Sequence, residues 1–324
     1  MTRIGLAVSI AAMVVASLTV SAQRAAAADK TIVYLCAGLE APFWRYVSKG
    51  AEAAAIEKGY KYSALDSRNN AQSQAQNAQD AVARNAAGIV LSPTDSSTAP
   101  AVLDVAAKAN IPVTFAGIGT TSGTYTTFVT SEDEKGAYAV GKEMAKALKA
   151  KGWEKAEIGL VLISQARVNG RWRTDGFVKA MTEAGNTVVA KNEMQLYTAD
   201  ETFRFVQDML TAHPNLRGIF VETDTPALGA ARAIAASRRT GQTLLAAFDG
   251  VPEFVTLLKK GELVASGMQQ PYLMGKEAGT ALTEKLAGQE PKKEIVLPIL
   301  TVTKDNVDEL LPTIKQTVFA GEMK

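Results

Sequence analysis

The 324-residue chain contains only one cysteine and one histidine. One cysteine cannot form an internal disulfide, and it cannot build a zinc site from several thiolates. One histidine excludes the histidine pairs of common metalloenzyme motifs, and no Gly-x-Ser-x-Gly segment of the kind that carries a hydrolase nucleophile occurs. We therefore predict that the protein holds no metal ion and is not an enzyme.

An excess of positive charge is also missing, because 35 Lys and Arg face 33 Asp and Glu and leave a net charge of +2. Nucleic-acid-binding surfaces normally show a clustered basic excess, so we expect no nucleic-acid partner. With 47% hydrophobic and 21% charged residues, the composition is that of a globular protein rather than a mainly disordered chain. The length predicts two lobes or one large α/β unit.

The N-terminus carries the longest apolar run of the chain. Arg3 precedes an almost uncharged stretch over 4–20, which is followed by the small residues Ser21, Ala22 and Ala25 to Ala28. This order predicts a cleavable secretory signal peptide over residues 1–28, with Ala22 as the alternative cleavage site. The other interpretation is a membrane anchor, but the run is slightly short and no positive stop follows it.

From residue 30 onward, short β-branched runs alternate with longer helical patterns, which is typical of α/β proteins with parallel sheets. Two series of five strands favour two similar lobes over a single ten-stranded sheet. The expected strands are 31–37, 60–66, 88–91, 113–116, 126–129, 157–163, 187–195, 218–221, 244–247 and 264–269. The expected helices include 44–58, 73–85, 99–109, 136–150, 174–184 and 202–212.

A short internal repeat supports the duplication. The strand at 88–91 is followed by Asp95, and the strand at 218–221 is followed by Asp224, in each case just before a new helix. An Asp in this place is either a helix N-cap or a ligand-binding residue, because ligands of open parallel sheets lie beyond the carboxyl ends of the strands. Both interpretations stay open for both residues.

Two other features carry no cofactor or catalytic prediction. Gly117, Gly119 and Gly123 lack the helix that a dinucleotide fingerprint needs behind it, so we predict no nucleotide cofactor. His213 is expected at a helix end on the opposite side of the sheet from the site, where it interacts with free carbonyl groups.

The loops after the strands hold aromatic and charged residues together. Phe43 and Trp44 begin a helix beyond the first strand, either as core residues or as a stacking face for a sugar ring, and Tyr197 offers a similar face from the second lobe. Arg173, expected just before a helix at 174, offers several fixed hydrogen-bond donors, and Asp249 ends a strand where a carboxylate can accept two sugar hydroxyls. Salt bridges and caps are the alternative roles of Arg173 and Asp249. Together with the aromatic residues they favour a carbohydrate cleft.

These segments also carry a family resemblance. They occur in this order: Pro42-Phe43-Trp44, Leu65-Asp66-Ser67-Arg68-Asn69-Asn70, Ser92-Pro93-Thr94-Asp95-Ser96, Arg173-Thr174-Asp175-Gly176-Phe177 and Phe248-Asp249-Gly250. Over essentially the whole chain after residue 28, the pattern resembles the ribose-binding protein family, the type I sugar receptors of bacterial ABC importers. The resemblance implies two similar doubly wound parallel-sheet lobes joined by a three-crossing hinge that closes around the ligand. It implies a lobe 1 of 29–131 plus 270–298 and a lobe 2 of 132–269 plus 299–324.

The resemblance also assigns a ligand site, although unevenly. Ala41 and Thr223 stand where the family has Asn, and Ala116-Gly117 replaces an Asp-Arg pair. These changes remove one charge of each sign from one side of the pocket and argue against ordinary ribose binding. The residues expected to bind the ligand are Phe43, Trp44, Arg173, Tyr197, Thr223, Asp224, Asp249 and Gln269. The orientation of five further residues stays open, namely Glu40, Gln165, Asn169, Arg171 and Glu222.

The function implied is that of a monomeric periplasmic receptor that captures a small carbohydrate or polyol and hands it to an ABC transporter permease. A small-molecule sensor that presents its bound form to a chemoreceptor or histidine kinase fits the same site. An exported enzyme is disfavoured, since no nucleophile and base pair is evident.

Overall fold

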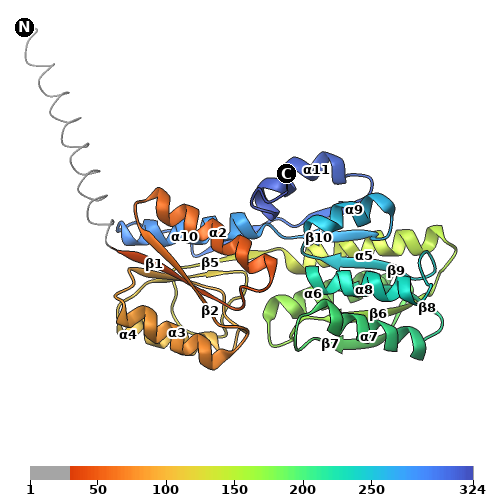
Figure 1. The fold of residues 1–324 in the computed structure, drawn as a ribbon, viewed down its shortest axis with the longest axis horizontal. Coiled ribbons are helices and arrows are strands. Elements are labelled where there is room, and N and C mark those ends of the chain that lie inside the picture. Colours follow the sequence, from red (N-terminus) through yellow and green to blue (C-terminus); the bar gives the residue numbers. More distant parts are fainter. Residues whose placement is uncertain (1–29, 324) are drawn as a thin grey trace, which may run out of the picture.

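The computed structural model describes residues 30–323, so the predicted signal peptide lies outside the described residues. The chain forms two α/β lobes side by side along the long axis of the molecule (Figure 1), each built on one six-stranded sheet. The predicted fold class is confirmed. Among the described residues, no helix is both long and apolar enough to cross a membrane.

The first lobe holds a fully parallel sheet with the strand order β11-β5-β4-β3-β1-β2. Its strands are β1 (Thr31–Cys36), β2 (Lys61–Asp66), β3 (Gly88–Leu91), β4 (Val113–Ala116), β5 (Thr127–Ser131) and β11 (Glu294–Leu297). Its helices are α2 (Pro42–Glu57), α3 (Ala71–Ala83), α4 (Ala99–Lys108) and α10 (Pro271–Leu286).

Alternate residues of β1 show why this sheet is apolar on both faces. Ile32 and Tyr34 pack with α2 and α10, whereas Val33 and Leu35 pack with α3 and α4. Successive side chains of a strand point to opposite faces, and both faces of this sheet carry a helical layer. A continuous apolar run is the expected sequence for such a strand.

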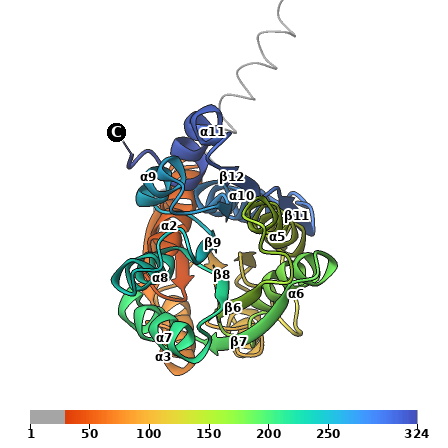
Figure 2. The ribbon, with the colours of Figure 1, turned by 90° about the vertical axis from the view of Figure 1, so that its right-hand side faces the viewer.

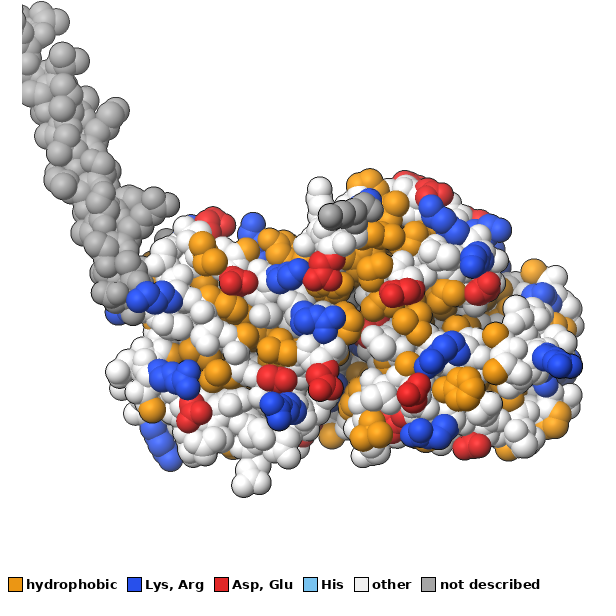
Figure 3. Space-filling view, viewed as in Figure 1, with side chains coloured by type: hydrophobic (Ala, Val, Ile, Leu, Met, Phe, Trp, Pro, Cys, Tyr) orange, Lys and Arg blue, Asp and Glu red, His pale blue; other side chains and the backbone are white. Residues whose placement is uncertain are grey.

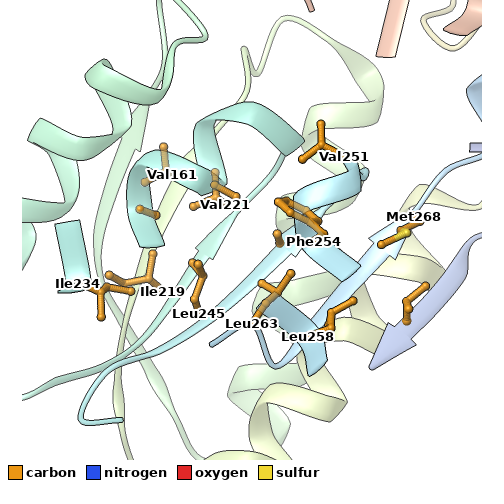
Figure 4. Packing of buried hydrophobic residues seen from close by; sticks show 14 of the residues in the cluster. Val161, Ile219, Val221, Ile234, Leu245, Val251, Phe254, Leu258, Leu263 and Met268 are labelled. Carbon is orange, nitrogen blue, oxygen red and sulfur yellow. The ribbon is translucent and has the colours of Figure 1, made fainter. Parts of the chain in front are cut away.

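The second lobe repeats this plan with the strand order β12-β10-β9-β8-β6-β7 (Figure 2). Its strands are β6 (Glu157–Leu162), β7 (Thr187–Glu193), β8 (Leu216–Val221), β9 (Leu244–Phe248), β10 (Ala265–Met268) and β12 (Leu300–Thr303). Its helices are α5 (Asp133–Ala150), α6 (Val168–Glu183), α7 (Ala199–Ala212), α8 (Asp224–Ala236), α9 (Pro252–Lys260), α11 (Val307–Thr313) and a π turn over Ile314–Val318. Figure 4 shows the layer where β6, β8 and β9 meet α8 and α9, with Phe254 among the buried side chains.

Two edge strands were missed at the sequence level. β11 and β12 follow one another along the chain, yet β11 adds to the first sheet and β12 pairs antiparallel with β10 in the second. Each strand has only four residues, and most of them are partly exposed. Such short strands lack a clear apolar run, so the sequence pattern did not distinguish them from loops.

The chain passes between the sheets after β5, after β10 and between β11 and β12. We propose that the lobe boundaries lie where the sequence placed them, with 29–131 plus 270–298 in one lobe and 132–269 plus 299–324 in the other. The change of sheet at each crossing supports this division.

Helix α6 begins six residues earlier than predicted, at Val168 rather than at Thr174. Its first turn contains Asn169 and Gly170, two residues of low helix propensity, which hid the start. Gly170 is needed there, because a Cβ would lie 2.7 Å from the carbonyl oxygen of Ser164. Arg173 therefore lies inside the helix and not in the loop before it, which was the wrong expectation.

The C-terminal segment of the chain returns to the first lobe. The ring of Phe319 packs against the ring of Tyr46 in α2, with 6.3 Å between the ring centroids. Lys49 Nζ donates to Glu322 Oε1 at 2.5 Å. The surface around these elements carries interspersed acidic and basic side chains and no large region of one sign on the face drawn in Figure 3.

Candidate ligand-binding site

A cavity of about 250 Å³ lies between the two lobes, at the carboxyl ends of the strands. This edge is where open parallel sheets bind ligands. All eight residues predicted from the sequence line the cavity, namely Phe43, Trp44, Arg173, Tyr197, Thr223, Asp224, Asp249 and Gln269. The volume falls below the roughly 300 to 1,000 Å³ typical of drug-sized ligands, which favours one small molecule.

The structure also settles the orientation of the residues left open. Glu40 and Asn169 line the cavity, whereas Gln165, Arg171 and Glu222 do not. Glu222 instead has a structural role inside lobe 2. Its carboxylate accepts from the backbone N–H of Ile163 at 2.9 Å and from the Thr174 hydroxyl at 2.5 Å.

Lobe 1 presents an aromatic wall. Pro42 starts α2 and places Phe43 and Trp44 in its first turn, with their rings edge to face at 4.7 Å between centroids. Gly117 comes next to them with a φ of +83°, and a Cβ on Gly117 would lie 3.5 Å from the Trp44 indole. The indole thus occupies the space beside Gly117. These rings offer shape and apolar contact, and among the lining residues of lobe 1 only the exposed Glu40 carries a charge, which is negative.

Lobe 2 presents a polar wall centred on Arg173. Its Nε donates to Asp133 Oδ1 at 2.8 Å, and its Nη1 donates to the Glu222 carbonyl at 2.6 Å and to Asp249 Oδ2 at 3.1 Å. The guanidinium also lies over the Phe248 ring, 4.2 Å from its centroid. Nη2 takes part in none of these hydrogen bonds and is the donor left for a ligand.

Asp249 connects Arg173 to two further predicted residues. Its Oδ2 also accepts from the Thr223 hydroxyl at 3.0 Å, and its Oδ1 accepts from Gln269 Nε2 at 2.8 Å. Asp249 directly follows β9 and has a φ of +61°, a left-handed conformation that Asp tolerates better than most residues. A connected network of this kind holds its members in place before a ligand arrives.

Burial and neighbouring charges shift the pKa values of the ionisable groups in this network. Burial alone would lower the pKa of Arg173, but the carboxylates of Asp249 and Asp133 raise it above its ordinary value. Burial raises the pKa of Asp133 to about 6 even though Arg173 lowers it. Arg173 thus stays charged, and it is the positive centre of the wall.

Asp224 is the first residue of α8 and not its N-cap, a position that Thr223 takes. Its Oδ1 accepts from the backbone N–H of Thr225 at 2.5 Å, whereas its Oδ2 is buried without a hydrogen-bond partner. Burial, and after it the charge of Asp249, raises the pKa of Asp224 to about 7. Since buried polar atoms nearly always have partners, Oδ2 is a place for a ligand donor. Asn169 Oδ1 is a second unpartnered acceptor among the lining residues.

Asp95, the counterpart of Asp224 in the repeat, lies outside the cavity lining. Its Oδ1 accepts from the backbone N–H groups of Ser97 and Thr98, in the turn before α4. Asp95 is thus a local turn residue, and α4 itself begins after Thr98.

Arg167 and Asn69 are two of the lining residues that the sequence analysis did not identify. Arg167 lies just before α6, and Asn69 follows β2 with a φ of +53°. The Arg167 guanidinium lies over the Tyr197 ring at 4.9 Å, and the Tyr197 hydroxyl accepts from the Ser164 N–H at 3.0 Å. Arg167 lies between β6 and α6, and nothing in the sequence pattern distinguishes it from a solvent-exposed Arg.

Comparisons with known proteins agree with this architecture. A family described as a periplasmic binding protein domain matches residues 32–290. The Ribose import binding protein RbsB of Escherichia coli (strain K12) is 29% identical over 292 residues, which are 89% of this chain and 95% of that protein.

Two solved structures share the fold. A carbohydrate transporter solute binding protein from Agrobacterium radiobacter in complex with D-arabinose has a TM-score of 0.82 at 24% identity, over 89% of this chain and 98% of that one. An ABC transporter solute binding protein from Mycobacterium smegmatis with bound glycerol has a TM-score of 0.81 at 25% identity, over 87% of this chain and 96% of that one. The resemblance to ribose-binding proteins is confirmed, and the chain belongs to the periplasmic binding protein domain family.

Proposed function

We propose that the protein is a periplasmic receptor that captures a small carbohydrate or polyol between its lobes and delivers it to an ABC permease, without catalysis. One observation carries this proposal: an aromatic wall from lobe 1 faces a preorganised wall of charged and amide groups from lobe 2 across a small cavity. The relatives named for ribose import and the neighbours that hold D-arabinose and glycerol support the ligand class.

The chemistry of the walls suits a hydroxyl-rich ligand. Sugar hydroxyl groups both donate and accept, and the cavity offers acceptors on Asp224 and Asn169 together with a donor on Arg173. The rings of Phe43 and Trp44 offer broad apolar contact to the C–H face of a sugar ring. A purely apolar ligand would leave those polar groups without partners.

The wall of lobe 1 carries no positive charge, and this bears on which carbohydrate is bound. With Ala116 and Gly117 after β4, lobe 1 lacks the Asp-Arg pair of the ribose-binding resemblance. We propose a ligand that makes its directional hydrogen bonds chiefly with lobe 2, such as a deoxy sugar, a polyol or a sugar other than ribose.

The cellular setting follows from the N-terminal sequence and the family. We propose that residues 1–28 are a cleaved signal peptide and that the mature monomer is periplasmic. Fractionation of the native host is expected to place the cleaved chain with soluble periplasmic markers, and an uncleaved chain in the membrane fraction would contradict it. Capture of an ABC permease rather than a chemoreceptor by the ligand-bound protein would distinguish transport from sensing.

A thermal-shift panel of pentoses, hexoses, deoxy sugars and polyols tests the ligand class. A ligand at 100 times its dissociation constant stabilises the folded protein by about 2.7 kcal/mol, which gives a clear rise in Tm. The Asp249→Asn variant serves as the control, since its Tm is expected to respond much less. A panel without any member that raises the Tm of the wild-type protein would overturn the proposed ligand class.

A further inference from the structure

Arg167 is a buried cation with neutral partners only. Its side chain lines the cavity and is 6% exposed, and no carboxylate among residues 30–323 lies within ion-pair distance of it. Buried charges are normally paired, because leaving water costs a charged group several kcal/mol. The same burial lowers the pKa of Arg167. A buried guanidinium beside a cavity is a candidate binding group when it has no ion pair and only the longer-range negative charge of Asp95 acts on it.

The partners of Arg167 belong to the other lobe. Arg167 comes from the segment between β6 and α6, yet its Nε donates to the Thr94 carbonyl at 2.8 Å and its Nη2 donates to Asn69 Oδ1 at 3.2 Å. The neighbouring backbone N–H of Val168 donates to the Ser96 hydroxyl at 3.4 Å, also across the cleft. Arg167 therefore bridges the cleft on its open side, away from the three crossings.

The geometry leaves one nitrogen of the guanidinium free for a ligand. Nε and Nη2 are both used to hold lobe 1, and Nη1 makes no hydrogen bond within the described residues. Tyr197 supports the planar group from one face at 4.9 Å. Lobe 1 has Gly117 where the resembling family has an Arg, so Arg167 brings a positive charge from lobe 2 to a wall that has none.

We propose that Arg167 couples ligand binding to closure of the cleft, with Nη1 bound to a ligand oxygen while Nε and Nη2 hold Thr94 and Asn69. This inference rests on the proposed function. In it, the guanidinium is oriented by lobe 1 only when the lobes are closed, and the ligand gains its donor only in that state. Closure and binding then reinforce each other.

Substitution of Arg167 tests the ligand contact. Arg167→Met keeps the length of the side chain but removes every donor, and it is expected to weaken sugar binding about 10-fold to 150-fold by calorimetric titration. Arg167→Lys keeps the charge but lacks the planar set of donors, so its affinity for the sugar is expected to lie between those of the wild-type protein and Arg167→Met. Arg171→Met is the matched control, since Arg171 is an exposed neighbour outside the cavity lining. Affinity of Arg167→Met within twofold of wild type would overturn the proposal.

Asn69→Asp tests the contact with lobe 1 separately. Asp tolerates the positive φ of residue 69 and gives Arg167 a carboxylate in place of the amide oxygen. The variant is expected to close more readily, with a smaller radius of gyration by small-angle scattering in the absence of ligand. This gain should vanish when Arg167→Met is added, which a double-mutant cycle measures directly. An equal effect in both backgrounds would overturn the bridge.

The two experiments separate this inference from the proposed function. If no sugar or polyol of the panel binds the wild-type protein, the proposed function fails, and the ligand-free scattering of Asn69→Asp and Arg167→Met still decides whether the bridge exists. If a sugar binds and Arg167→Met binds it equally well, the proposed function stands and the role of Arg167 is wrong.

Discussion

The two walls of the cavity differ in chemistry, because lobe 1 presents aromatic rings and lobe 2 presents charged side chains. Lobe 1 contributes Phe43, Trp44 and the backbone of Gly117, which line the cavity with mostly apolar surface. Lobe 2 contributes Arg173 and Asp249, whose positions are fixed by hydrogen bonds to each other and to neighbours. Apolar contact is nondirectional, whereas a charged hydrogen bond depends on position. From this comparison we propose that both walls contribute to affinity, whereas stereochemical selectivity comes chiefly from lobe 2.

The repeat within the chain shows how the two walls diverged. Asp95 after β3 and Asp224 after β8 occupy equivalent places in the sequence repeat. The Asp95 carboxylate accepts backbone hydrogen bonds in the turn before α4. Asp224 starts α8, lines the cavity and has one carboxylate oxygen without a partner. The same sequence signal therefore gives a structural residue in one lobe and a candidate ligand acceptor in the other.

Removal of Arg173 should produce the largest effect. Arg173→Met leaves Asp133 and Asp249 buried without their common cation, so we expect a loss of about 3 to 5 kcal/mol in the free energy of unfolding, together with loss of binding. Urea unfolding measures the first and calorimetric titration the second. Arg171→Met, an exposed neighbour on α6, should leave both unchanged. Wild-type stability of Arg173→Met would show that the buried network is not formed.

Asp249→Asn should have a smaller effect on the fold and a clear effect on binding. The amide can still accept a hydrogen bond, but it no longer carries the charge opposite Arg173. We expect affinity to fall about 10-fold to 150-fold, because a hydrogen bond to a charged group contributes about 1.5 to 3 kcal/mol. Calorimetric titration measures this loss. An unchanged affinity would remove Asp249 from the site.

Asp224 should make stability depend on pH. Its pKa rises from 3.8 to about 7 on folding. Between these two pH values, the carboxyl group is protonated in the folded protein and ionised in the unfolded chain. The stabilisation is complete below about pH 4 and is lost as the pH rises through 7. The difference in free energy of unfolding between wild type and Asp224→Asn should therefore shift against wild type as the pH rises. A pH-independent difference would show that Asp224 is ionised in the fold.

Trp44→Leu should show the smallest loss. Leu keeps apolar contact but not the flat ring, and aromatic contacts add about 0.5 to 1.5 kcal/mol beyond buried area, or about 2-fold to 12-fold in affinity. Titration with the same ligand measures it. A loss as large as that of Asp249→Asn would show that lobe 1 dominates the affinity.

The features predicted from the sequence were those with a strong local signal. The apolar run at 31–37 identified β1, and the residues just after the strands identified eight residues of the cavity lining. The start of α6 was hidden by Asn169 and Gly170, whose low helix propensity is overridden by packing. Edge strands β11 and β12 have few buried residues to mark them.

Arg167 and Asn69 could not be found from the sequence for a different reason. Their importance depends on a contact between segments 98 positions apart and in different lobes. No local pattern encodes such a contact. The structure supplied the missing information, since it showed that Arg167 is a buried cation without an ion pair beside the cavity.

The division between the two walls is tested most directly by the ratio of affinities for two epimers of the sugar that binds best, measured by calorimetric titration. Asp249→Asn should change this ratio, because it alters a directional contact that one epimer makes better than the other. Trp44→Leu should weaken both epimers alike and leave the ratio unchanged. A ratio changed as much by Trp44→Leu as by Asp249→Asn would contradict the assignment of selectivity to lobe 2.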